Sequence, residues 1–256
     1  MPAVLLRAIS SSINRTFESY LRHLGIYRPL RVKARIMDHI ENVRLVECKN
    51  SQYVKPTRML FKQNGHERAW DLMKTHDSVA AVLHNTSRNV LLFVRQFRPG
   101  EEILVMAVYY GRIPAEEIAK GGPIDTTKYP GSLGLTLELC AGIVDKSSMS
   151  REETMQQEIL EECGYNVPLS GIHKVTSFRA GVGVLGARQD LFFAEVTDDM
   201  RQTAGGGCDA EGEMINVVEL TLPEARKMLT DETIMRPSAL LFGVTWFLEM
   251  RPKLKA

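Results

Sequence analysis

An acidic run near the middle of the chain constrains the fold more than any other stretch: residues 158 to 164 read Glu-Ile-Leu-Glu-Glu-Cys-Gly. Helix-favouring residues lead into it, and residues three and four apart share one helical face. Glu158, Glu161 and Glu162 are therefore predicted to project together and to repel one another. Such a cluster indicates a cation between the carboxylates, and an all-oxygen ligand set suits Mg2+ or Mn2+. The alternative is a solvated acidic helix end.

The residues around this run predict where its helix begins and ends. Ser150 is followed three residues later by Glu153, the capping-box pattern of a helix start. Gly164 is the residue type that most often ends a helix. Upstream, residues 137 to 145 form an apolar stretch that runs through Gly142 into a polar loop. The predicted order is therefore strand, glycine loop, helix, acidic cluster and glycine.

This order resembles the Nudix box, whose pattern is Gly, five residues, Glu, seven residues, then Arg-Glu-apolar-any-Glu-Glu-any-Gly-apolar. The second half matches at residues 158 to 165. The first half departs: the spacing from Gly142 is one residue too long, Ser148 or Met149 replaces the first Glu, and Gln157 replaces the Arg. Because the metal-binding half is intact, we expect a variant box in preference to a lost activity.

A wider resemblance, from about Met37 to about Leu248, is to the UDP-sugar pyrophosphatase branch of the Nudix hydrolases. It implies an α/β Nudix fold, a mixed β-sheet sandwiched by helices with an N-terminal antiparallel β layer. It also implies a homodimer formed through the N-terminal strands. The segments that carry the resemblance are Gln63-Asn64-Gly65, residues 70–79, 94–99 and 138–142, Gly181-Val182-Gly183, Gly205-Gly206-Gly207 and Glu211-Gly212-Glu213.

The resemblance assigns the metal site to the acidic run and to the strand before it. Glu158 and Glu162 are expected to bind the ion directly, and Glu161 to bind it directly or through water. The main-chain carbonyl of Ala141, just before Gly142, is the expected backbone ligand. Mg2+ is the expected cofactor, with Mn2+ as a substitute.

Further residues are expected around the substrate. The planar donor fork of Arg98 suits a phosphate, although a surface arginine after a strand is the plainer interpretation. Glu211 and Glu213 match the region that carries the general base in related enzymes, and we favour Glu211. The turn containing Gly183, together with Arg188, is expected to border the substrate.

Three functional hypotheses follow. The first is a Mg2+-dependent hydrolase that converts a UDP-sugar such as UDP-glucose into UMP and a sugar 1-phosphate. The second keeps this mechanism with ADP-ribose as the substrate. The third is a non-catalytic protein that binds nucleotide sugars, motivated by the missing Arg and first Glu of the box. No motif in the sequence reads a sugar ring.

Composition excludes other classes. A net charge of +1 gives no general attraction to nucleic acid, and no apolar run approaches the roughly 20 residues needed to span a bilayer. The four cysteines have no C-x-x-C spacing, which favours free thiols in a reducing, intracellular setting. Cys140 and Cys163, which flank the box, are expected to be core residues.

Residues 1 to 36 differ from the remainder of the chain. They are rich in Arg and Ser, carry Glu18 as the single acid, and place apolar residues at helical spacing. This pattern is typical of a mitochondrial transit peptide, and an ordinary surface helix is the alternative. We expect an N-terminal extension at 1–36, a β layer used for dimerisation at 37–78 and the hydrolase domain at 79–256. The cytoplasm is the expected location, with mitochondria as the alternative.

Local patterns predict the remaining elements. Asn64-Gly65 is a strong signal for the turn of a β-hairpin. Strands are expected at residues 43–46, 57–61, 66–71, 79–83, 90–94, 191–196 and 215–220, and helices at 223–229 and 238–249.

Overall fold

The computed structural model describes residues 37, 39–41, 43, 51, 55–98, 125–127, 130–208, 210 and 212–251. The expected transit peptide at 1–36 and the strand expected at 43–46, from residue 44 onward, lie outside the described residues. So does Glu211, the favoured candidate for the general base. No helix in the described part of the chain is long and apolar enough to cross a bilayer.

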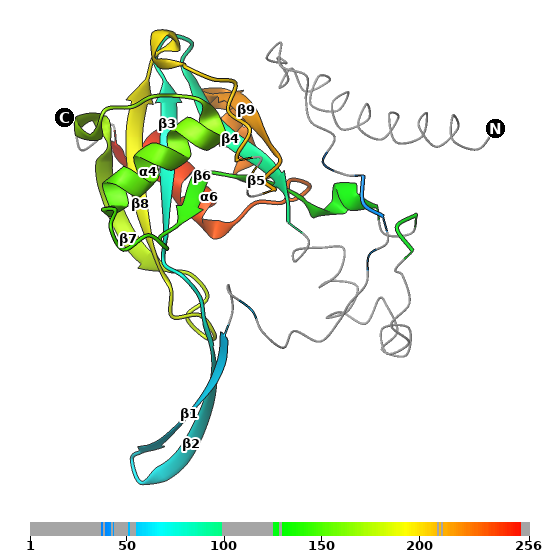
Figure 1. Cartoon of the computed structure of the whole chain (residues 1–256), viewed down its shortest axis with the longest axis vertical. Coiled ribbons are helices and arrows are strands. Elements are labelled where there is room, and N and C mark those ends of the chain that lie inside the picture. Colours follow the sequence, from blue (N-terminus) through cyan, green and yellow to red (C-terminus); the bar gives the residue numbers. More distant parts are fainter. Residues whose placement is uncertain are drawn as a thin grey trace.

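An antiparallel hairpin projects away from the main body (Figure 1). Its strands are β1 (Lys55–Gln63) and β2 (His66–Lys74). Asn64 and Gly65 join them with φ values of 51° and 84°, the left-handed pair that a tight hairpin turn of type I′ requires. The hairpin predicted from Asn-Gly is confirmed, and it supplies the two-stranded antiparallel layer expected near the N-terminus.

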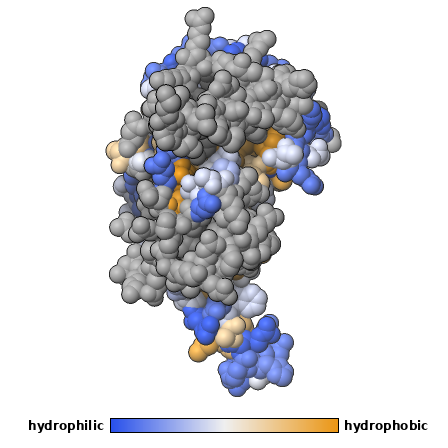
Figure 2. Space-filling view, turned by 90° about the vertical axis from the view of Figure 1, so that its right-hand side faces the viewer, coloured by the Kyte–Doolittle hydropathy of each residue, from blue (hydrophilic) through white to orange (hydrophobic). Residues whose placement is uncertain are grey.

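Side chains alternate between the two faces of this hairpin, and each face carries both apolar and charged residues. On one face Met59 lies opposite Trp70, with Phe61 on the same side. The other face carries the ion pair between Arg58 and Asp71. Figure 2 shows the hairpin at the bottom of the molecule, with hydrophobic residues beside hydrophilic ones.

A mixed seven-stranded sheet forms the main body. Its path runs β5-β4-β3-β8-β7, with β6 paired to β3 and β9 paired to β4. The pair β3 with β8 is parallel, and the other pairs are antiparallel. The strands are β3 (Ser78–Asn85), β4 (Val90–Phe97), β5 (Leu135–Glu138), β6 (Cys140–Ile143), β7 (His173–Arg179), β8 (Arg188–Val196) and β9 (Ile215–Thr221).

The strands expected at 79–83, 90–94, 191–196 and 215–220 are confirmed within β3, β4, β8 and β9. The single strand expected to lead into Gly142 is interrupted at Leu139, so that it pairs first with β4 and then with β3. Strand β7 was not predicted. Its residues are mostly polar and exposed or half-buried, so no apolar alternation marks it.

Helices cover both faces of the sheet (Figure 1). On one face lies α4 (Arg151–Glu158), continued by a π-helical turn, η2 (Ile159–Cys163). On the other lie α5 (Leu222–Met228) and α6 (Ser238–Thr245), which continues into the π-helical turn η6 (Trp246–Met250). Each face has its own apolar core. The expected sandwich of a mixed sheet between helices is confirmed.

The acidic helix begins as predicted and ends differently. Ser150 Oγ accepts a hydrogen bond from the backbone N–H of Glu153, and the Glu153 carboxylate accepts one from the N–H of Ser150. Gly164 ends the helix in the left-handed conformation, with φ of 83°. The last turn is not α-helical, because it widens into the π-helical turn η2. Short 3-10 helices lie at η1 (Gly131–Gly134), η3 (Leu169–Gly171) and η4 (Asp198–Met200).

Candidate active site

The centre of the site is a buried carboxylate. Glu162 lies in the π-helical turn with 2% of its surface exposed, between the helix and strand β6. Its Oε2 accepts a hydrogen bond of 2.9 Å from the backbone N–H of Ala141. Cys140 and Cys163 are fully buried in the same apolar core, which confirms their predicted packing role. The π turn therefore directs one glutamate of the acidic run inward, onto the strand that precedes the loop.

The surroundings of Glu162 disfavour its negative charge. Burial raises the pKa of this carboxyl to about 8, and the charges of Glu158 and Glu213 act in the same direction. The N–H of Ala141 and the thiol of Cys140 act in the opposite direction, because their hydrogen bonds stabilise the carboxylate. A cation between these carboxylates would remove the penalty, since an opposite charge favours the ionised form.

Glu158 is packed directly against Gly142. A Cβ atom at position 142 would lie 2.0 Å from Glu158 Oε1, closer than any side chain can approach. Gly142 pairs with Val79 of β3, so the carboxylate rests on the edge of the sheet. A side chain at position 142 would displace the Glu158 carboxylate from this place, and the two carboxylates at positions 158 and 162 both face strand β6.

Glu161 points elsewhere. Its Oε1 accepts a hydrogen bond of 2.8 Å from Gln157 Nε2, one turn earlier on the helix. Gln157 stands where the Nudix pattern has Arg, so a neutral donor holds this carboxylate in place of a cation. The shared metal-binding role of the three glutamates stays a prediction: Glu158 and Glu162 approach β6, and Glu161 is hydrogen-bonded to Gln157.

The Gly-rich stretch that the sequence singles out caps the end of the acidic helix. Gly206 N–H donates to the carbonyl of Glu162 at 2.9 Å, and Gly207 N–H donates to that of Glu161 at 3.0 Å. A Cβ atom on Gly205 would lie 2.3 Å from the oxygen of Glu162. Terminal carbonyls of a helix lack partners within it, and here a loop distant in sequence supplies them.

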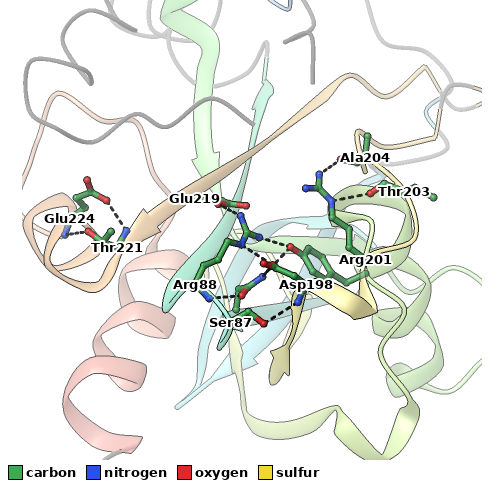
Figure 3. A network of polar contacts seen from close by, with 11 residues as sticks. Ser87, Arg88, Asp198, Arg201, Thr203, Ala204, Glu219, Thr221 and Glu224 are labelled. Atoms are coloured by element: carbon green, nitrogen blue, oxygen red, sulfur yellow. Dashed lines mark hydrogen bonds and ion pairs between the residues drawn. The ribbon is translucent and has the colours of Figure 1, made fainter. Parts of the chain in front are cut away.

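A polar network holds Tyr165, two residues after the helix ends at Cys163. Figure 3 shows its members Arg88, Asp198 and Glu219. The Tyr165 hydroxyl accepts hydrogen bonds from Arg88 at 2.8 Å and from Asn85 at 3.2 Å. Arg88 also pairs with Asp198 and Glu219. Sequence reasoning missed this network because its members come from different strands and turns, and no local pattern connects them.

Arg201 links this network to the Gly-rich stretch. Its guanidinium lies over the ring of Tyr165, 5.9 Å from the centroid. The same group donates to the carbonyls of Thr203 at 3.1 Å and Ala204 at 3.3 Å (Figure 3). The end of the acidic helix and the loop that caps it are therefore held as one unit.

Glu213 closes a short loop beside the carboxylates. Its Oε2 accepts the N–H of Cys208 at 3.0 Å, and its own N–H donates to the carbonyl of Cys208 at 3.2 Å. Because its charge acts on Glu162, Glu213 belongs to the acidic centre. The structure therefore brings one of the two general-base candidates to the site.

Arg98 follows β4 and pairs with Glu138 at the end of β5. Its Nε and Nη2 donate to the two carboxylate oxygens of Glu138 at 3.0 and 3.1 Å. Partial burial acts to lower the pKa of Arg98, but Glu138 outweighs it, and the charges of Glu162 and Glu213 raise this pKa further. Arg98 is therefore a cation near the acidic centre, and Glu138 is a neighbour that the sequence did not reveal.

The two other substrate-binding candidates have structural partners. Arg188 donates to Asp190 Oδ1 at 2.8 Å and to Ser177 at 3.0 Å, and Asp190 is fully buried. Gly183 lies at the base of the hairpin, where its carbonyl accepts a hydrogen bond of 2.9 Å from the indole N–H of Trp70. Arg188 thus compensates a buried aspartate, and Gly183 attaches the hairpin to the main body.

The donor set fits a hard divalent cation in its chemistry. Glu158, Glu162 and Glu213 contribute carboxylate oxygens of like charge to one region, and oxygen ligands suit Mg2+. Across the described ranges, however, no three acidic, imidazole or thiol groups are already gathered as tightly as a complete site.

Comparison with known proteins adds independent evidence. No family model matches the chain. It is 41% identical over 215 residues to the uridine diphosphate glucose pyrophosphatase of Bos taurus, covering 82% of this chain and 95% of that protein. It is 37% identical over 218 residues to the same enzyme of Mus musculus, with the same coverage. A GDP-mannose pyrophosphatase of Pectobacterium atrosepticum is 29% identical over 158 residues, covering 62% of this chain and 66% of the relative.

Proposed function

The chain belongs to the Nudix hydrolase family, and from that membership we propose that it hydrolyses UDP-glucose to UMP and glucose 1-phosphate in a Mg2+-dependent reaction. It is an enzyme that acts on the pyrophosphate bond of nucleotide sugars. The observation that carries the proposal is the buried carboxylate of Glu162. It packs against strand β6, as Glu158 does, and accepts a hydrogen bond from the N–H of Ala141. Burial raises the pKa of this carboxyl to about 8, and a bound cation would favour its ionised form; a buried carboxyl beside a second glutamate therefore supports a cation-binding function.

Each group in the acidic centre has a role in this reaction. Glu158, Glu162 and the carbonyl of Ala141 would hold Mg2+, and Glu161 would bind it through water once released from Gln157. When bound, the ion screens the phosphates, lowers the pKa of a water molecule and stabilises the leaving phosphate. Mn2+, with the same preference for oxygen ligands, is expected to substitute.

The other residues orient the substrate and move the proton. Arg98 binds a phosphate through its guanidinium. A glutamate of the loop after Cys208 takes the proton of the attacking water. We assign this role to Glu211, with Glu213 holding the loop through its bonds to Cys208. The water oxygen bonds to one phosphorus, the bridging P–O bond breaks, and two phosphate monoesters leave.

A substrate panel tests the proposal. Purified protein is incubated with UDP-glucose, GDP-mannose and ADP-ribose, with Mg2+ and with EDTA, and the products are separated by anion exchange. We expect UMP and glucose 1-phosphate in equal amounts, and no turnover in EDTA. GDP-mannose is included because bacterial relatives carry that specificity in their names. Preference for another sugar nucleotide would revise the substrate, and binding without cleavage would favour a non-catalytic protein.

We also propose that the chain is a homodimer joined through the β1–β2 hairpin. An isolated two-stranded hairpin is marginally stable in water. This one exposes Met59 and Trp70 on one face, and Val182 and Val184 are exposed in the turn at its base. Light scattering should give the mass of a dimer for the parent and of a monomer for Met59→Glu. Lys62→Gln, on the opposite face of the hairpin, is the control, and a monomeric parent would reject the proposal.

A further inference from the structure

One edge of the Arg98 guanidinium is fully occupied by Glu138. Nε and Nη2 donate to the two carboxylate oxygens at 3.0 and 3.1 Å, a two-point pair. A guanidinium has five N–H groups in one plane. Two of them meet Glu138, so the edge formed by Nη1 and the outer N–H of Nη2 points the other way. The orientation of that outer edge is set by Glu138.

Glu138 is itself immobilised. Its side chain is 14% exposed, and the buried hydroxyl of Thr136 donates to its Oε1. The amide of Gln96, also buried, donates weakly to Oε2 at 3.4 Å. Gln96 pairs with Thr136 in the register of β4 and β5, so the support comes from two adjacent strands. Paired strands are less mobile than loops, so Thr136 and Gln96 hold the Glu138 carboxylate in a fixed position.

Glu138 and Arg98 lie next to the acidic centre. Glu138 precedes by three residues Ala141, whose N–H binds Glu162. Arg98 lies close enough to Glu162 and Glu213 to respond to their charges. A substrate phosphate held between Arg98 and the acidic residues with their cation would lie within reach of the guanidinium N–H groups that do not bind Glu138.

We propose that Glu138 is the positioning residue of Arg98, which it holds with its outer edge directed at a substrate phosphate. The inference rests on the proposed function, in which Arg98 contacts the nucleotide sugar. Glu138 does not touch the substrate. A two-point contact between arginine and phosphate depends strongly on the plane of the guanidinium. Loss of the Glu138 contact should therefore weaken phosphate binding even though Arg98 remains.

A double-mutant cycle tests this role. Glu138→Asp keeps the charge and shortens the side chain by one methylene, so it separates positioning from electrostatics. Affinity for UDP-glucose is measured by calorimetry in EDTA, and KM and kcat are measured with Mg2+. Glu195→Asp, the same shortening in the pair of Glu195 with Arg251, is the control. Circular dichroism and thermal unfolding check the fold of every variant.

We expect Arg98→Ala to raise Kd and KM by about tenfold or more, the scale of one charged hydrogen bond. Glu138→Asp should raise them by about fivefold, with a smaller change in kcat. In the Arg98→Ala background Glu138→Asp should add less than about twofold, because it acts through a residue already removed. Glu195→Asp should leave Kd and KM unchanged.

Several outcomes would overturn the role. Unchanged or tighter binding by Glu138→Asp would do so, as would effects that multiply in the double variant. Glu138 would instead be a metal ligand if Glu138→Asp still raised Kd and KM in the Arg98→Ala background and also shifted the Mg2+ concentration that gives the half-maximal rate. If the parent binds UDP-glucose without cleaving it, the proposed function fails while the calorimetric cycle still decides the role of Glu138. A parent that neither binds nor cleaves would reject both.

Discussion

The carboxylate of Glu162 accepts a hydrogen bond of 2.9 Å from the backbone N–H of Ala141. This bond joins the end of the acidic helix to the strand that precedes the box glycine. It places a side-chain ligand candidate and a backbone ligand candidate next to each other, although 21 positions separate them in the chain. The relationship explains why the wide π turn is useful: it directs Glu162 inward, toward the sheet.

The first prediction concerns Glu162→Gln. If this carboxylate holds the metal, the variant should lose several orders of magnitude in kcat with UDP-glucose at saturating Mg2+. In EDTA it should be as stable as the parent or slightly more so, because burial, followed by the charges of Glu158 and Glu213, disfavours an ionised carboxylate at this position and a neutral amide avoids that cost. Glu152→Gln, earlier on α4, is the control. Urea unfolding and steady-state rates provide the two measurements, and near-parent turnover of Glu162→Gln would reject its assignment.

Gln157→Arg restores the residue of the Nudix pattern. Gln157 Nε2 already binds Glu161 at 2.8 Å, and an arginine at this position would keep that contact as an ion pair. Since both pairings hold Glu161 along the helix, kcat/KM should change by less than tenfold. An inactive parent that becomes active on this substitution would show instead that the natural chain has a degenerate box.

Gly205→Ala tests the cap on the acidic helix. The new methyl group would lie 2.3 Å from the carbonyl oxygen of Glu162, and φ at this position is 71°. Gly65→Ala is a matched control, because φ is 84° there and nothing lies within 4 Å. The strained backbone alone should cost about 1 kcal/mol, and the collision should make Gly205→Ala clearly worse in urea unfolding. Equal losses in the two variants would argue that the cap is not tight.

Asp77→Asn tests the pH dependence of stability. The backbone N–H of Arg188, followed by the side chain of Arg151, lowers the pKa of Asp77. A lowered pKa in the folded state stabilises the fold above the unfolded value of about 4, and the gain is lost as pH falls through the folded value. Asp77→Asn should therefore be less stable than the parent at pH 7, by about 1 kcal/mol or less given its partial exposure.

Below about pH 4 the difference between Asp77→Asn and the parent should shrink toward zero, because the carboxyl of the parent becomes neutral too. Urea midpoints measured from pH 7 to pH 3 check this sign. Asp145→Asn, at an exposed position, serves as the control. A difference that stays constant with pH would mean that the charge of Asp77 does not contribute.

The N-terminal segment gives the last prediction. Residues 1 to 36 are acid-poor and precede the region of family resemblance, so a chain that starts at Met37 should retain its activity and most of its thermal stability. Fluorescent protein fused after Arg35 should enter mitochondria if the segment is a transit peptide. A diffuse cytosolic signal would support the cytoplasmic location that we favour. Aggregation of the chain that starts at Met37 would indicate that the segment packs on the enzyme.

Signals between neighbours in the sequence predicted much of this protein. Ser150 with Glu153 predicted the helix start, Asn64-Gly65 the hairpin, and Gly164 the helix end. Their success has one physical cause: a cap or a tight turn is decided by the backbone conformation of a few consecutive residues. The acidic run likewise indicated the location of the site, because the carboxylates belong to one helix.

Tertiary structure alone decided how those carboxylates are used. Helical spacing predicted one common face, but packing against β6 buried Glu162 and left Glu161 bound to Gln157. Pairing of β4 with β5 placed Glu138 beside Arg98. These contacts join residues that lie far apart in the chain, and their energies depend on burial and on strand register. Neither quantity exists until the sheet has formed, which is why the sequence by itself indicated the candidate ligands and only the fold decided their environment.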